Sequence, residues 1–192
     1  LSEKAYSISI RAFTTGTLDR LMTFTIEARA RGKFSGIKAN STEYVTAYSN
    51  KKVKRQVTVK YPDNNRASVN AKPAYKRFRD TVTLHAKHLR NVVDPLGGMI
   101  LPYNNKFAPS DPRQCNRAQS VFDGLTNYKL VMSPIKNTLK NDKLLKNAVA
   151  CKVRYHPIAG HRKSQKSQFS TAKVWLLPID EAKTLLPVRV SI

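Results

Sequence analysis

The sequence is poor in acidic residues, cysteine and histidine, and each scarcity argues against a class of function. Its 192 residues include 12 Asp and Glu against 35 Lys and Arg, a formal net charge of +23. Paired carboxylates for acid–base catalysis therefore have few candidates, and Asp94 and Asp123 are better explained as a helix cap and a turn residue. The two cysteines form no CxxC pair, and His85 and His88 have no neighbouring Glu, so we predict no metal site.

Motifs for covalent or phosphate chemistry are also missing. There is no GxSxG nucleophile elbow, and residues 160–167 lack the two-glycine spacing of a P-loop. We therefore predict a protein that is not an enzyme and needs no cofactor. The longest apolar patch, residues 92–103, is interrupted by Asp94, Pro95 and two glycines, whereas a spanning helix needs about 18 apolar residues. The chain starts at Leu1, which fits either an internal piece or removal of a signal peptide.

Alternation of apolar and polar residues, which is typical of strands, covers most of the chain. Tyr6, Ile8 and Ile10 alternate with serines before a turn signal at residues 14–17, and a second alternating run follows at 22–29, so we predict a hairpin. Further strands are predicted at residues 44–48, 53–61, 121–122, 128–132, 150–155, 173–177 and 186–192. Many short strands at regular spacing predict one mainly β, antiparallel domain over residues 1–192.

Helix signals are few. The strongest covers residues 94–101, where Asp94 would be the N-cap and Pro95 the first helical residue. Residues 141–147 give a weaker signal, and residues 32–37 fit either a short helix or a loop.

Basic residues cluster in several places along the chain. An excess this large attracts polyanions, so nucleic acid, anionic phospholipid, lipopolysaccharide and acidic glycans are all candidate partners, and a compositional bias is the alternative. The aromatic residues are scattered on alternating positions, which indicates core rather than an RNA-binding face, so a nucleic-acid-binding module is the second hypothesis. The candidate residues for an anionic surface are Lys51, Lys52, Lys54, Arg55, Arg162, Lys163 and Lys166.

Three stretches carry a resemblance to a known family. They are Cys115-Asn-Arg-Ala-Gln-Ser-Val-Phe-Asp-Gly124, then Asn127-Tyr-Lys-Leu130, then Cys151-Lys-Val-Arg-Tyr-His-Pro-Ile-Ala-Gly160. This pattern resembles the exported bacterial family called domain of unknown function 3108, and the resemblance covers nearly the whole chain. The sequence departs from the family at Lys51 and Lys52, where a glycine-containing turn is expected.

The resemblance implies a localisation and an architecture. Family members carry signal peptides, which places the chain in the periplasm or cell envelope and implies a disulfide between Cys115 and Cys151. Such a bridge would stabilise the fold by about 4 kcal/mol. The family also implies a long curved antiparallel sheet, like an open barrel, and its hollow side could bind a lipid, a glycan or an envelope protein. We expect the helix at 94–101 to fill part of that hollow. Trp175 fits either the lining of the hollow or, as is more common for a single Trp in a strand, the ordinary core.

Overall fold

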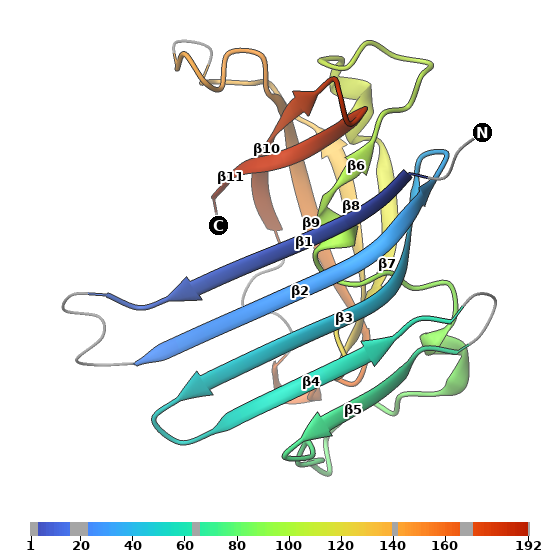
Figure 1. Cartoon of the computed structure of the whole chain (residues 1–192), viewed down its shortest axis with the longest axis vertical. Helices are drawn as coiled ribbons and strands as arrows, with labels where there is room; N and C mark the ends of the chain where they lie inside the picture. Colours follow the sequence, from blue (N-terminus) through green and yellow to red (C-terminus); the bar gives the residue numbers. More distant parts are fainter. Residues whose placement is uncertain (1–3, 16–22, 63–65, 140–141, 166–170, 192) are drawn as a thin grey trace.

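The front of the molecule is a five-stranded antiparallel sheet. In the computed structural model, residues 4–15, 23–62, 66–139, 142–165 and 171–191 are described, and the chain is mainly β, as predicted. The strands of the front sheet are paired in chain order, so each is joined to the next by a hairpin (Figure 1). They are β1 (Lys4–Phe13), β2 (Phe24–Ser35), β3 (Lys38–Asn50), β4 (Lys54–Lys60) and β5 (Ser68–Lys72).

A six-stranded antiparallel sheet lies behind the first, and several of its strands cross those of the front sheet at a steep angle (Figure 1). Its strand order is β6-β11-β10-β9-β8-β7, so the short β6 lies at one edge beside the last strand of the chain. One of the two sheets is strongly curled into a half-barrel. The strands are β6 (Leu101–Pro102), β7 (Arg117–Phe122), β8 (Asn127–Pro134), β9 (Val149–Ala159), β10 (Thr171–Ile179) and β11 (Thr184–Ser191).

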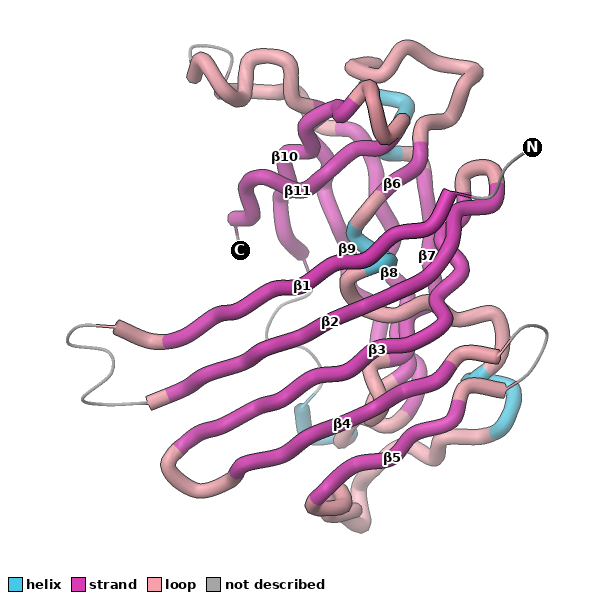
Figure 2. Tube along the Cα trace, viewed as in Figure 1, coloured by secondary structure: helices cyan, strands magenta, loops and turns pink. Residues whose placement is uncertain are grey.

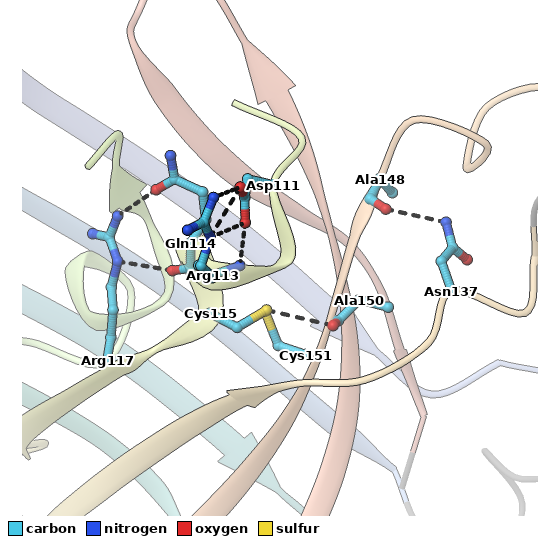
Figure 3. The surroundings of a disulfide bond; sticks show 9 residues. All are labelled: Asp111, Arg113, Gln114, Cys115, Arg117, Asn137, Ala148, Ala150 and Cys151. Atoms are coloured by element: carbon cyan, nitrogen blue, oxygen red, sulfur yellow. Dashed lines mark hydrogen bonds and ion pairs between the residues drawn. A yellow bond between two sulfur atoms is a disulfide. The ribbon is translucent and has the colours of Figure 1, made fainter. Parts of the chain in front are cut away.

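The predicted disulfide is confirmed and belongs to the core of the rear sheet. Cys115 and Cys151 are bonded, their Cα atoms lie 5.6 Å apart, and both side chains are fully buried (Figure 3). Leu101, Leu176 and Leu185 are buried in the same cluster. Because Cys115 ends a short 3₁₀ turn and Cys151 lies in β9, the bond fastens the segment before β7 to the middle of the sheet.

The predicted helix at 94–101 is wrong in length: only one 3₁₀ turn, Gly97–Met99, forms there (Figure 2). Asp94 Oδ1 accepts hydrogen bonds from the amides of Leu96 and Gly97, as a cap would. The chain then enters β6 at Leu101, whose pairing with β11 ends the helical turn. The turn contacts β2, β3 and β7, so it fills space between the two sheets.

The weaker helix signals also form other structures. Residues 142–147 form turns, because Asp142 Oδ1 accepts from the amides of Leu144 and Leu145. Residues 32–37 are the end of β2 and its turn into β3. At the β3–β4 hairpin, Asn50 supplies the turn chemistry that a glycine was expected to provide, since its Oδ1 accepts from the amides of Lys52 and Val53.

Candidate functional site

The inner face of the front sheet is not fully covered at β5. Residues paired directly across an antiparallel ladder share a face, so Val69 and Ala71 lie on the same face as their partners Val59 and Val57. Val57 and Val59 are 2% and 0% exposed, whereas Val69 is 46% exposed. The apolar face that forms the core at β4 therefore continues to β5 without the covering layer.

A cavity of about 690 Å³ opens at this uncovered face. Its walls come from four places: the inner face of β5, the connector of residues 74–84, the turn between β7 and β8, and the end of β9. Most of the wall is apolar. Its lining residues are Val69, Ala71, Ala74, Tyr75, Lys76, Arg77, Phe78, Thr81, Val82, Thr83, Leu84, Gly124, Leu125, Thr126, Tyr155, Gly160, His161 and Arg162.

Two glycines in the left-handed region bring the rear sheet to this wall. Gly124 has φ +97°, and a Cβ there would lie 2.7 Å from Val57 Cγ1, so only glycine lets the β7–β8 turn approach the front sheet. Gly160 has φ +83°, and a Cβ there would lie 2.1 Å from the carbonyl oxygen of Leu125. The two glycine-containing stretches that carried the family resemblance therefore meet at the cavity.

The connector is fastened to the end of β9. The Val82 amide donates to the His161 carbonyl at 2.9 Å, and the Gly160 amide donates to the Val82 carbonyl at 2.9 Å. Asp80 accepts from Ser164 Oγ at 2.6 Å and pairs with Arg162 Nε at 3.0 Å. The hydrogen bond from Ser164, aided by Arg162, lowers the pKa of Asp80. These contacts give the cavity an ordered outer wall.

Two arginines stack on aromatic rings of this wall. The Arg162 guanidinium carbon lies 4.4 Å from the Phe78 ring centroid, and that of Arg55 lies 4.5 Å from the Tyr75 centroid. Arg55 Nε also donates to the Pro73 carbonyl at 2.8 Å. Cation–π contacts of this kind position the rings while leaving part of each guanidinium in water.

The charged residues that line the cavity are all cationic, and the carboxylates of Asp80 and Asp123 lie just outside the lining. Lys76 and Arg77 are exposed lining residues, Arg162 is half-buried, and no carboxylate is among the lining residues. Asp80, next to the wall, is occupied by Arg162 and Ser164. An apolar interior with a cationic rim can bind an apolar tail and an anionic group in one molecule.

The two tyrosines that line the cavity are neutral. Burial raises the phenol pKa of both Tyr75 and Tyr155, so both rings carry a hydroxyl rather than a phenolate at neutral pH. Tyr155 also packs against Tyr128, with ring centroids 4.8 Å apart. The Nδ1 atom of His161 is buried without a hydrogen-bond partner among the described residues.

The proposed anionic-surface residues are placed unequally. Arg162 lines the cavity, and Arg55 contacts its wall through Tyr75. Lys163 is exposed in the 3₁₀ turn that follows β9, and Lys166 lies outside the described residues. The other three belong to the β3–β4 hairpin and are exposed: Lys51, Lys52 and Lys54.

Trp175, a candidate for lining the hollow, is 6% exposed and packs elsewhere. It lies in a separate cluster with Leu145, Ala148 and Ala150, and its Nε1 donates to Asn137 Oδ1 at 3.2 Å. Asn137 in turn donates to the carbonyl of Ala148 (Figure 3). Trp175 thus fixes the segment between β8 and β9.

Sequence reasoning did not single out the apolar residues of the cavity. Val69 and Leu125 are 46% and 39% exposed, and neither has a neighbouring pattern that marks it. Lys76 and Arg77 form a visible basic cluster, but their position beside Val69 depends on how the connector returns to β9.

Comparison with protein-family models, curated proteins and solved structures finds no match for this chain. Among the described residues, no helix has the length and apolar character needed to cross a membrane. Within the same ranges, no three His, Cys, Asp or Glu side chains gather as ligands for a metal ion.

Proposed function

We propose that this chain is a non-enzymatic binding protein of the bacterial cell envelope whose ligand is an anionic amphiphile. The apolar tail of the ligand would occupy the cavity beside β5, and its anionic head group would meet Lys76 and Arg77. The resemblance to the exported family of unknown function and the Cys115–Cys151 disulfide support the envelope localisation, because disulfides persist in oxidising compartments.

One observation carries the proposal: an apolar sheet face that is core at Val57 and Val59 is left open at Val69. Leaving Val69 46% exposed forgoes about 1 kcal/mol of burial free energy. A cavity of about 690 Å³ also falls within the size of small-molecule sites, roughly 300–1,000 Å³. A ligand that covers Val69 and Leu125 would recover that burial.

The lining and rim of the cavity favour a lipid over a glycan or a protein partner. Apolar lining favours a ligand with a hydrocarbon part, and a rim of Lys76 and Arg77 without carboxylates favours a negative head group. Near an anionic membrane surface each cation contributes about 1 kcal/mol, so the same rim would help deliver a ligand from a membrane. Anionic phospholipid and lipopolysaccharide both have this chemistry.

The binding test is calorimetric titration of the full chain with dodecanoate and with dodecyl phosphocholine at physiological salt. We expect saturable binding of dodecanoate and weaker binding of the zwitterion. Val69→Asp should abolish binding, because it places a carboxylate in the apolar wall. Val188→Asp is the matched control, since Val188 is 41% exposed on β11 and is not a lining residue.

A second pair of variants separates the head group from the tail. Lys76→Gln with Arg77→Gln should weaken dodecanoate binding about tenfold and leave the zwitterion unchanged, since about 1.4 kcal/mol corresponds to that factor. The control is Lys152→Gln with Arg154→Gln, two exposed cations on β9. If both double variants lost the same dodecanoate affinity, the effect would come from the net charge of the chain alone, which would contradict the proposal.

A further inference from the structure

A second hollow, of about 480 Å³, lies where the two sheets meet away from the cavity. Three segments form it: the β2–β3 turn and the start of β3 (37–40), the loop of residues 91–93, and the start of β7 with the residue before it (116–120). The two hollows share no lining residue. Its chemistry also differs, because amide side chains replace the aromatic rings.

Four of its lining residues carry an amide side chain: Asn40, Asn91, Asn116 and Gln119. None of the four amide groups makes a side-chain hydrogen bond to another described residue. Each offers two N–H donors and one carbonyl acceptor. Asn91 and Asn116 are exposed and Gln119 is half-buried, so these amides are open to a ligand that presents alternating hydroxyl donors and acceptors.

The backbone of β7 adds further polar groups to the groove. The Val93 amide donates to the Ser120 carbonyl, and the Phe122 amide donates to the Val93 carbonyl, so Ser120 and Phe122 direct their backbone groups away from β8. Since these directions alternate along a strand, Ala118 directs its N–H and C=O to the same side. Beyond the bridge at Val93, this edge of β7 faces the groove.

Two features hold the groove open in a fixed shape. Asn91 has φ +53°, a left-handed conformation that sets the direction of the loop. Arg117 donates to the carbonyls of Ile37 and Pro102, which ties the β2–β3 turn to β6. Burial lowers the pKa of Arg117 to about 10, so the guanidinium remains charged at neutral pH.

We propose that this groove binds a saccharide chain through Asn91, Asn116 and Gln119. Ile37, 44% exposed at one end, supplies an apolar surface for the C–H face of a sugar ring. Lys38 and Arg117, with no carboxylate in the lining, also admit acidic sugars. An extended peptide fits less well, because within residues 117–119 only Ala118 directs its N–H and C=O to the open edge, which leaves a single residue for strand pairing.

The test uses neutral oligosaccharides, so that the +23 charge of the chain does not dominate binding. Cellotetraose, maltotetraose and N-acetylchitotetraose are added at millimolar concentration to the ¹⁵N-labelled full chain. The readout is the side-chain NH₂ resonances of Asn and Gln. We expect at least one sugar to shift the resonances of Asn91, Asn116 and Gln119, and to leave that of Asn105, an exposed residue outside the groove, unchanged.

The variant Asn91→Gly removes an amide while keeping the backbone conformation, because glycine adopts positive φ without strain. Combined with Asn116→Ala and Gln119→Ala, it should weaken sugar binding at least tenfold, whereas Asn105→Ala should have no effect. Absence of shifts with all three sugars overturns the proposal, as does undiminished binding by the triple variant. Dodecanoate titration of the same triple variant should be unchanged, so failure here is distinguishable from failure of the lipid proposal.

Discussion

The space between the two sheets is filled at one end and open at the other. At the filled end, Leu96, Phe122 and the buried Asp94 occupy the space, and Asp94 Oδ2 accepts hydrogen bonds from Tyr6 and Ser41 at 2.8 and 2.6 Å. At the open end, the same sheet face continues to Val69 and meets a cavity. The difference arises from what the chain inserts, because the strands are apolar on this face at both ends.

The two ends are expected to contribute to different properties, the filled end to stability and the open end to ligand binding. Residues at the filled end have their polar groups paired inside the protein, so changing them should lower stability. Residues at the open end leave apolar surface exposed, so changing them should alter ligand binding with little loss of stability.

The largest effect is expected from opening the filled end. Asp94→Ala removes the acceptor for the hydroxyls of Tyr6 and Ser41 and for the amides of Leu96 and Gly97. Leaving these buried donors unpaired should cost about 3–5 kcal/mol in the free energy of unfolding, measured by urea denaturation. The exposed control Glu181→Ala should change it by less than about 0.5 kcal/mol. A similar small change for Asp94→Ala would contradict the structural role given to this carboxylate.

The disulfide lies away from the cavity and should affect stability alone. Replacing Cys115 and Cys151 with Ser should cost about 2–4 kcal/mol, because the unfolded chain gains freedom. Dodecanoate affinity, measured on the folded fraction at low temperature, should remain within a factor of two to three, about 0.5 kcal/mol. If the fully folded variant no longer bound dodecanoate, the disulfide would be needed for the shape of the cavity, which would contradict this prediction.

High pH should lower the free energy of unfolding through the buried phenol of Tyr44. Burial raises the pKa of Tyr44 to about 12, above the ordinary value of 10.0 that it regains on unfolding. The contribution of the neutral Tyr44 phenol to the free energy of unfolding is therefore complete below pH 10 and is lost as the pH rises toward 12. Denaturation of Tyr44→Phe at pH 9 and pH 12 should show a smaller decline than wild type, by up to about 2 kcal/mol. An equal decline would assign alkaline sensitivity to other tyrosines.

Gly124→Ala should affect both stability and ligand binding. The added Cβ would clash with Val57 and Val59, and the φ of +97° is strained for any residue other than glycine. We expect a loss of about 1–3 kcal/mol together with weaker dodecanoate binding. Gly36→Ala is the control: Gly36 has φ +57° with no atom within 4 Å, so strain alone should cost about 1 kcal/mol. If both variants lost the same stability, the clash of the new Cβ with Val57 and Val59 would not explain the effect of Gly124→Ala.

The smallest change is expected from filling the open end. Ala71 lines the cavity and is half-buried, so Ala71→Leu adds apolar surface in free space. The free energy of unfolding should stay unchanged or rise by about 0.5–1 kcal/mol, while dodecanoate binding falls. A large destabilisation would show that the cavity wall is already closely packed.

Much of the fold could be predicted from the sequence, because alternation is a local signal. Strands β1 to β4 and β7 to β11 all overlap predicted ranges. Strand β5 was missed because Ser68–Lys72 is short and mostly exposed. The helix at 94–101 was overpredicted because pairing of Leu101 with β11, which the local sequence does not reveal, ends the helical turn.

The cavity could not be predicted, because its walls come from segments separated by up to about ninety positions. Alternation reveals which residues share a face of a strand but not whether another layer covers them, which is the property that distinguishes Val69 from Val59. Gly124 and Gly160 were visible as parts of motifs, but their contacts with Val57 and Leu125 depend on the packing of the two sheets.

The most direct test of the central claim is a crystal structure of the chain with terminally brominated dodecanoate. Anomalous scattering would locate the bromine, and the account predicts it among Val69, Ala71 and Leu125, with the carboxylate beside Lys76 and Arg77. Bromine found only on other surfaces, with the cavity beside β5 holding ordered water, would contradict it.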